Sequence, residues 1–237
     1  MLKAIKKSFR TITVSNNLKK CILDYYHDLN NLIVIPNGVD KESFSYIPHL
    51  SQHRKQKNSK RILMVGNLIK QKGQHLLVDA LKRYENYNPA IRVYFVGMGE
   101  LSSFIKANSI LANGIRLIYL GFIPNDCLVN IYNKMDLFCL LSESEGNPNV
   151  VLEALASGLP VLATNVGDLS SIINEDNGYI LESRDIKSIL KGLEFCLNKN
   201  WDREKISKSV NSLSWEVTVN KINTIFSELV SYHKIAN

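Results

Sequence analysis

Short β-branched runs alternate with segments of helical period along almost the whole chain. Eight runs predict strands, at residues 11–14, 32–35, 61–65, 92–96, 115–120, 137–141, 160–163 and 179–181. Five segments between them predict helices, at residues 74–87, 101–111, 126–134, 150–156 and 185–197. Strands that alternate with crossover helices run parallel in one sheet. We therefore expect an α/β fold with a doubly wound, Rossmann-like parallel sheet.

The chain divides at residues 46–60, which are polar, charged and without period, and so predict a linker. Residues 1–45 are too few to bury a core of their own, so we expect either an edge addition to the main sheet or the remnant of a larger domain. Residues 61–213 then form the main domain. Residues 214–237 predict a helix with Ser214 as its N-cap. Its apolar stripe, which we expect to pack on the core, is Trp215, Val219, Ile222, Ile225, Phe226 and Leu229.

The formal charge of +7 is concentrated in two clusters, one within the first twenty residues and one at residues 54–61. Such clusters bind nucleic acid, lie on an anionic membrane or are simply solvated. Neither is interleaved with aromatic residues, which argues against a nucleic-acid partner. Residues 1–12 place apolar side chains at helical spacing opposite a basic face. That pattern fits a helix on a bilayer or a packed amphipathic helix, and no apolar run approaches the roughly 18 residues of a spanning helix.

The cysteines and histidines indicate no metal site. The four cysteines lie far apart without a CxxC pair, and the five histidines have no ligand spacing. There is also no Asp-x-Asp pair, which would hold a divalent ion on a diphosphate. The chain shows no secretory signal. We expect a cytoplasmic protein that uses neither metal nor cofactor.

Glycine or a turn former occurs in every loop that follows a strand of the predicted main sheet, at residues 66–73, 97–100, 121–126, 142–149 and 164–168. Ligands of open parallel sheets bind at the carboxyl ends of the strands. Glycine lets backbone approach a ligand closely, and the amino ends of helices attract anions. The loops therefore suggest a phosphate site. The Gly97-Met98-Gly99 sequence lacks the third glycine of a dinucleotide fingerprint, which argues against a nicotinamide enzyme.

The stretch SESEGNPNVVLEALASGLPVLAT, residues 142–164, contains Glu145 and Glu153 on the two sides of a Gly-Asn-Pro-Asn turn. Asparagine caps helices well, so we expect a helix to begin here with the amides of residues 149–151 facing a phosphate. Glu153 is suited to accept hydrogen bonds from a ribose diol, and Glu145 from the hydroxyls of a sugar beyond the phosphates. The competing interpretation of Glu153 is a first-turn acid that stabilises the helix dipole. Lys72 either neutralises a diphosphate or is a turn residue beside glycine.

These residues resemble the retaining, metal-independent glycosyltransferases of the GT-B class, in the large group of glycosyl transferases group 1. The resemblance runs through ITVSNNLKK, VIPNGVD, ILMVGNLIKQKG, VYFVGMGEL, IYLGFIPNDCL, LFCLLSESEGNPNVVLEALASGLPVLATNVG, NGYIL and SWE. Its most specific part is the E-x7-E pattern of Glu145 and Glu153.

The resemblance implies a carboxyl-terminal GT-B domain that binds a nucleotide-diphosphate sugar, UDP- or GDP-linked. It implies that Glu145 contacts the donor sugar and Lys72 the diphosphate, as the catalytic residues, and that Glu153 contacts the ribose. The loops at Gly97–Glu100 and Phe122–Ile123 would border the base. The donor-binding residues that it implies are Gly66, Asn67, Gly73, Gly97, Gly99, Phe122, Ile123, Gly146, Asn147, Pro148, Asn149, Val150, Val151 and Glu153. Transfer would be front-face, with the departing diphosphate helping to activate the acceptor.

The chain departs from the family pattern at three positions: Asn67 stands where arginine is common, Asp168 where the second glycine is common and Ser171 where glutamate is common. We also expect the acceptor-binding amino-terminal Rossmann domain to be absent apart from its last strands.

The expected function is retaining sugar transfer to a carbohydrate or lipid-linked acceptor hydroxyl, in surface polysaccharide or glycolipid synthesis, in the cytoplasm or peripherally at the inner face of the membrane. The alternatives are a non-catalytic nucleotide-sugar-binding subunit or truncated chain that needs a partner for the acceptor site, and a nucleotide-sugar epimerase.

Overall fold

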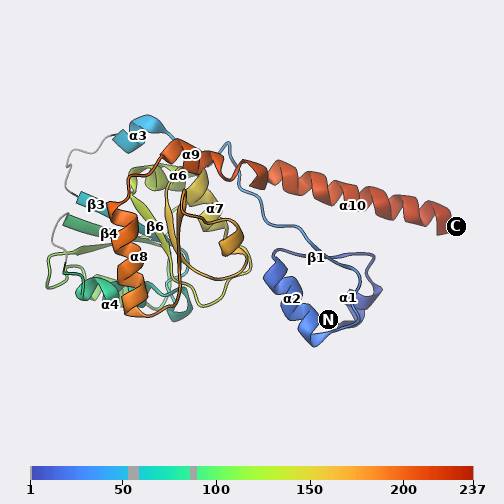
Figure 1. Ribbon diagram of the computed structural model, residues 1–237, viewed down its shortest axis with the longest axis horizontal. Helices are drawn as coiled ribbons and strands as arrows, with labels where there is room; N and C mark the ends of the chain where they lie inside the picture. The colour runs from blue at the N-terminus through green and yellow to red at the C-terminus, as the bar shows by residue number, and fades with distance from the viewer. Residues whose placement is uncertain (1, 53–58, 86–89, 237) are drawn as a thin grey trace.

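The computed structural model describes residues 2–52, 59–85 and 90–236. Its main unit is a six-stranded parallel sheet with the strand order β5-β4-β3-β6-β7-β8 (Figure 1). The strands are β3 Ser59–Val65, β4 Ala90–Val96, β5 Arg116–Gly121, β6 Leu137–Leu140, β7 Val161–Thr164 and β8 Gly178–Leu181. The sheet winds outward from β3 in one direction and from β6 in the other, which is the doubly wound order of Rossmann folds. The predicted fold class is confirmed.

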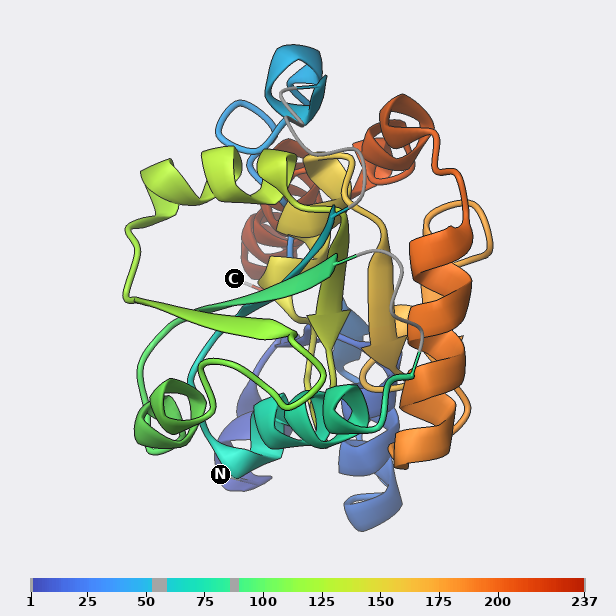
Figure 2. The ribbon, with the colours of Figure 1, turned by 90° about the vertical axis from the view of Figure 1, so that its left-hand side faces the viewer.

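Helices cover both faces of this sheet (Figure 2). They are α4 Gln74–Lys82, α5 Ser102–Ala107, α6 Asn125–Lys134, α7 Asn149–Ala156, α8 Ile186–Asn198 and α9 Arg203–Lys208, with the 3₁₀ turns η1 Lys70–Lys72, η2 Leu169–Ser171 and η3 Asn211–Leu213. Successive strand residues point to opposite faces. Ile62 therefore packs with α4, α5 and α8 in one core, and Leu63 packs with α6, α7 and α9 in the other. This two-sided burial explains why the strands are apolar throughout.

The amino-terminal residues form a separate small unit. It consists of α1 Leu2–Lys7, β1 Thr11–Thr13, α2 Asn16–Tyr25 and β2 Leu32–Val34. β1 and β2 pair parallel in a sheet of their own, so the expectation of an edge addition to the main sheet is wrong. The helix suggested by the period of residues 1–12 also ends early, at Lys7. Its Ile5 carbonyl accepts from Ser8 Oγ at 2.8 Å and from Asn31 Nδ2 at 2.7 Å, two side chains that compete with helix continuation.

The predicted linker at residues 46–60 has structure. It contains α3, Pro48–Gln52, and β3 begins within it at Ser59. Asn133 of α6, which is fully buried, accepts from Ile47 N at 2.7 Å and donates to Ser45 O at 2.9 Å. The sequence pattern missed this segment because its anchor lies more than 80 residues away.

Two sequence features fall partly outside the described residues. Of the second basic cluster, Arg54, Lys55 and Lys57 lie there. Tyr87, the end of the helix predicted at 74–87, lies there too, and α4 ends at Lys82.

The last helix, α10 Trp215–Ala236, extends away from the main sheet past the amino-terminal unit (Figure 1). Its predicted cap is confirmed, because Val217 N donates to Ser214 Oγ at 3.3 Å. The predicted core packing of its stripe is wrong. The exposed fractions are 43% for Trp215, 48% for Val219 and 60% for Phe226. None of the helices in the described part of the chain is both long and apolar enough to cross a membrane.

Candidate functional site

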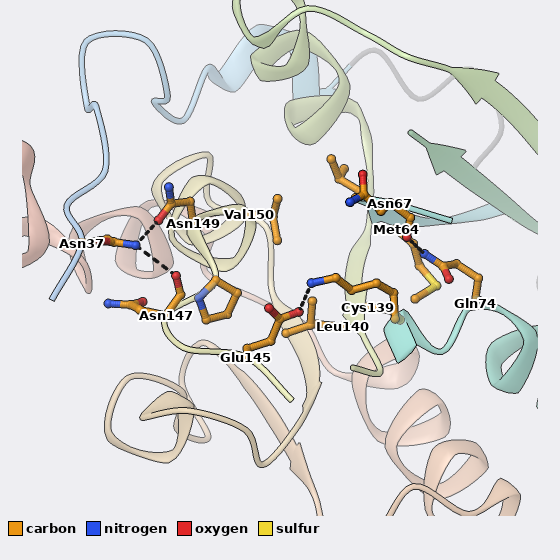
Figure 3. Close-up of a pocket in the computed structure, with 14 residues that line it drawn as sticks. Asn37, Met64, Asn67, Gln74, Cys139, Leu140, Glu145, Asn147, Asn149 and Val150 are labelled. Carbon is orange, nitrogen blue, oxygen red and sulfur yellow. Dashed lines mark hydrogen bonds and ion pairs between the residues drawn. The ribbon is translucent and has the colours of Figure 1, made fainter. Parts of the chain in front are cut away.

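A cavity of about 360 Å³ opens at the carboxyl ends of β3 and β6, where the winding of the sheet reverses (Figure 3). Open α/β sheets bind ligands at this position. The lining residues are Asn37, Met64, Val65, Gly66, Asn67, Lys72, Gln74, Cys139, Leu140, Glu145, Asn147, Pro148, Asn149 and Val150. Eight of the predicted site residues are among them: Gly66, Asn67, Lys72, Glu145, Asn147, Pro148, Asn149 and Val150. The fold thus brings together segments that lie about 80 residues apart in the chain.

Lys72 and Glu145 form an ion pair in this cavity, with 2.6 Å between Nζ and Oε1 (Figure 3). The side chains are only 27% and 12% exposed, so the pair is largely withdrawn from water. Lys72 ends η1, and Gly73 then takes the left-handed conformation, with φ of +76°. A β-carbon on Gly73 would lie 2.3 Å from Leu141 O. Glycine is required here for the loop to pack on the end of β6 and bring Lys72 close to Glu145.

The amino end of α7 forms the opposite wall. The expectation that asparagine caps this helix is wrong, since Pro148 is the N-cap and no side chain caps it. Asn149 Oδ1 instead accepts from Asn37 Nδ2 at 2.8 Å. The amide of Val151 donates to Pro148 O at 3.0 Å and is not free, contrary to expectation. Within the described residues no hydrogen bond occupies the amides of Asn149 and Val150. Two donors at the positive end of the helix dipole thus remain for an anion.

A second cavity, of about 620 Å³, lies beside the first and contains Glu153. It is lined by Gly38, Val39, Asp40, Ser43, Phe44, Asn125, Asp126, Asn149, Glu153 and Trp215. Glu153 is only 9% exposed, and its Oε2 accepts from Tyr132 OH at 2.9 Å. Burial raises the pKa of Glu153, against the lowering effect of the Tyr132 hydrogen bond. Asn149 lines both cavities, so the two acids face neighbouring spaces on either side of it.

Glu153 does not act as a first-turn acid, because α7 has no acidic residue in its first turn. The competing interpretation from the sequence is therefore wrong.

The other predicted site residues, Gly73, Gly97, Gly99, Phe122, Ile123, Gly146 and Val151, line neither cavity. A β-carbon on Gly97 would lie 1.9 Å from Gly66 O, and one on Gly99 would lie 2.4 Å from Leu68 O. Both glycines also have a positive φ. They are required where two loops of the chain meet, so their presence is explained without a ligand. Gly66, in contrast, has a φ of +139° with open space beside it, in the first cavity.

Sequence reasoning missed several lining residues. Gln74 is 2% exposed, and its Nε2 donates to Asn67 O at 2.9 Å, while its Oε1 has no hydrogen-bond partner among the residues that the structure describes. Gln74 directly follows Lys72 and Gly73 in the sequence, and this position was the only sign that it belongs to the site. Asn37, Asp40 and Trp215 come from the crossing segments near the amino-terminal unit and α10. The sequence segments VIPNGVD and SWE contain these residues and belong to the family resemblance, but nothing local assigned them to the site, because only the tertiary fold places them there.

The site lies at the switch point of a Rossmann-like sheet. It combines a paired cation and carboxylate with a free helix amino end, which is a class of binding site suited to anionic, hydroxylated ligands. Comparison with known proteins identifies the family. The profile described as Glycosyl transferases group 1 matches residues 48–212, and the chain belongs to this family.

Two curated relatives match nearly the whole chain. The UDP-Gal:alpha-D-GlcNAc-diphosphoundecaprenol alpha-1,3-galactosyltransferase of Escherichia coli is 31% identical over 242 residues, which cover 96% of this chain and 62% of the relative. The capsular polysaccharide biosynthesis glycosyltransferase CapM of Staphylococcus aureus is 26% identical over 237 residues, which cover 92% of this chain and 62% of the relative. The chain thus spans about three fifths of the length of these relatives.

Solved structures confirm the GT-B fold. A sucrose-phosphate synthase from Thermosynechococcus elongatus superposes with a TM-score of 0.79 at 18% identity, over 97% of this chain and 60% of the other. Anabaena HepE in complex with UDP superposes with a TM-score of 0.78 at 18% identity, over 95% of this chain and 65% of the other. At this level of identity the likeness extends to the fold alone.

Proposed function

We propose that this chain binds a nucleotide-diphosphate sugar as part of a retaining glycosyltransferase that acts in surface polysaccharide or glycolipid synthesis. The observation that carries the proposal is the Lys72–Glu145 pair opposite the free amides of Asn149 and Val150. A diphosphate needs cations and N–H donors, and a sugar needs carboxylate acceptors. The cavity presents both kinds of group at the switch point of the sheet.

The two cavities suggest how the donor lies. The diphosphate occupies the first cavity between Lys72 and the amino end of α7, and the sugar lies against Glu145. The nucleoside extends past Asn149 toward the second cavity, where Glu153 accepts from the ribose hydroxyls. The base then lies toward Phe122 and Ile123. UDP is the favoured carrier, since the E. coli relative is named for UDP-Gal and HepE was solved with UDP, and GDP is the other candidate.

The proposed chemistry requires no metal or cofactor. The bond between the anomeric carbon and the β-phosphate oxygen breaks, and its electron pair leaves on the diphosphate. The acceptor oxygen bonds to the same face of the anomeric carbon, and its proton passes to the departing diphosphate. Lys72 and the amides of Asn149 and Val150 stabilise the charge that develops on the leaving group. Glu145 holds the sugar in the orientation that the attack on the anomeric carbon requires.

A second candidate function is a nucleotide-sugar-binding subunit whose acceptor site comes from a partner chain. The exposed apolar stripe of α10 favours it, because such a face is normally covered. Donor hydrolysis or transfer by the purified chain supports the enzyme. Donor binding without turnover, with turnover appearing when a second polypeptide is added, supports the subunit. Release of an isomerised sugar without acceptor indicates an epimerase.

The role of Lys72 is tested by replacing it with alanine and measuring the affinity for UDP and UMP calorimetrically. Loss of a charge-assisted contact to the diphosphate lowers UDP affinity by about 1.5–3 kcal/mol. UMP lacks the second phosphate and loses less. Lys70→Ala is the matched control, because Lys70 lies in the same turn, is exposed and does not line the cavity. Equal losses in the two variants would remove Lys72 from the site.

The roles of the two acids are separated by a pair of substitutions. Glu153→Gln loses charge-assisted bonds to the ribose, so affinity for free UDP falls by about 1.5–3 kcal/mol. Glu145→Ala spares UDP but weakens UDP-galactose. If both variants only lower the melting temperature and bind both ligands as the wild type does, the acids are structural and the donor assignment is wrong.

A further inference from the structure

Asp168 joins the main unit to the amino-terminal unit. Its Oδ2 accepts from Asn16 N at 2.6 Å and from Asn16 Nδ2 at 2.9 Å, and its Oδ1 accepts from Asn17 N at 3.0 Å. Asn16 and Asn17 are the first residues of α2, whose own N-cap Ser15 accepts from Leu18 N at 3.1 Å. A carboxylate from about 150 residues along the chain thus completes the amino end of this helix, where negative charge is favourable.

The segments that Asp168 joins both contact the loop that carries Glu145. From the amino-terminal unit, Val14 O accepts from Asn147 Nδ2 at 3.4 Å, and a β-carbon on Gly146 would lie 3.2 Å from Val14 Cγ2. From the main unit, Gly167 approaches so closely that a β-carbon on it would lie 2.4 Å from Gly146 O. The loop between Glu145 and Asn149 is therefore in contact with Val14 of one unit and Gly167 of the other. Asp168 is the charged contact that connects these two segments directly.

We propose that Asp168 is a positioning residue for the donor site, which it orders by fastening the amino end of α2 against the loop at Glu145. This inference rests on the proposed function. Without the carboxylate, the first amides of α2 lose their acceptor, and the contact of Val14 with Gly146 and Asn147 is weakened. The peptide at Gly146 and Asn147 then has more freedom, and Glu145 and the free amides of α7 must be ordered by the ligand.

Asp168→Ala is the principal test, with Asp185→Ala as the matched control. Asp185 caps α8 through Ser188 N at 2.9 Å, but it does so within the main unit and does not line either cavity. Two quantities are measured at a temperature where every variant is folded: hydrogen exchange at the amides of Asn16 and Asn17, and affinity for UDP-galactose. We expect exchange about fivefold faster and Kd about fivefold higher in Asp168→Ala, the factor that corresponds to one carboxylate at a helix terminus. The control changes neither.

Asp168→Asn keeps an acceptor oxygen but loses the charge, so both quantities should fall between those of the wild type and Asp168→Ala. This graded response excludes simple misfolding. Asp168→Ala with wild-type exchange, or with faster exchange and unchanged UDP-galactose affinity, overturns the inference. If the wild-type chain binds no nucleotide sugar, the proposed function fails, and exchange at Asn16 and Asn17 still shows whether Asp168 fastens α2.

Discussion

Glu153 carries opposing influences on its pKa at one carboxyl group. Burial raises the pKa, and the hydrogen bond from the hydroxyl of Tyr132, 2.9 Å away, lowers it. The effect of burial is the larger, so the pKa of Glu153 is raised. Burial likewise raises the pKa of Tyr132, so this hydroxyl stays a donor. A buried carboxyl of this kind has one oxygen committed to the protein. Glu153 also lines the second cavity, so its carboxyl borders the space that a ligand there would occupy.

The raised pKa predicts how stability depends on pH. The folded state binds the Glu153 proton more tightly than the unfolded state, whose carboxyl titrates near the ordinary value of 4.5. The free energy of unfolding contributed by this group therefore falls as pH rises from the ordinary pKa through the raised one. Glu153→Gln should remove that decline.

Urea unfolding of the wild type and of Glu153→Gln, at a series of pH values from 4 upward, measures the difference. Glu194→Gln serves as the control, since Glu194 is exposed on α8. A difference between wild type and Glu153→Gln that does not vary with pH would show that the pKa of Glu153 is not raised.

At the scale of elements, local patterns predicted those strands and helices whose residues bury themselves on the sheet. All six strands of the main sheet begin and end within two residues of their predicted bounds. Patterns failed where a distant side chain determines the structure. Asn133 orders residues 45–47 before α3, and Asn31 donates to the carbonyl of Ile5 in the last turn of α1. Periodicity carries no information about either contact.

Asn133 provides a test at this scale. Asn133→Leu leaves Ile47 N and Ser45 O without their partners, and each unpaired group costs about 1–3 kcal/mol where it stays buried. We expect a lower urea midpoint and faster proteolysis near α3. Asn130→Leu on the same helix is exposed and should leave both unchanged. Similar behaviour of the two variants would contradict the anchoring role of Asn133.

At the scale of the whole molecule, the site is only half predictable from the sequence. The E-x7-E pattern and Lys72 located the first cavity, because their loops follow strands of one sheet. The sequence did not show that Glu145 and Glu153 face separate cavities, since the direction of a side chain depends on where the helix begins. Nor did it show that residues 37–44 and Trp215 complete the site, because these come from segments that cross between the two units.

The exposed apolar side chains of α10, which include Val230 beside the predicted stripe, lead to a prediction about the isolated chain. Val219, Phe226 and Val230 are 48%, 60% and 55% exposed, so replacing all three by serine should change the free energy of unfolding by about 0.5 kcal/mol or less per site. The triple variant should also bind less of a dye that detects exposed apolar surface. Ile206→Ser, at a fully buried position, should in contrast lose about 2–5 kcal/mol. A large loss of stability in the triple variant would show that α10 is packed in solution.

The position of Asn149 connects the site with the segment that leaves the amino-terminal unit. It lines both cavities, and its side-chain oxygen accepts from Asn37, which belongs to the chain leaving the amino-terminal unit. If holding this segment in place changes the affinity for a ligand by some factor, the ligand must change the equilibrium between the held and released forms of the segment by the same factor. This linkage would act within the site itself, since Asn37 lines the first cavity.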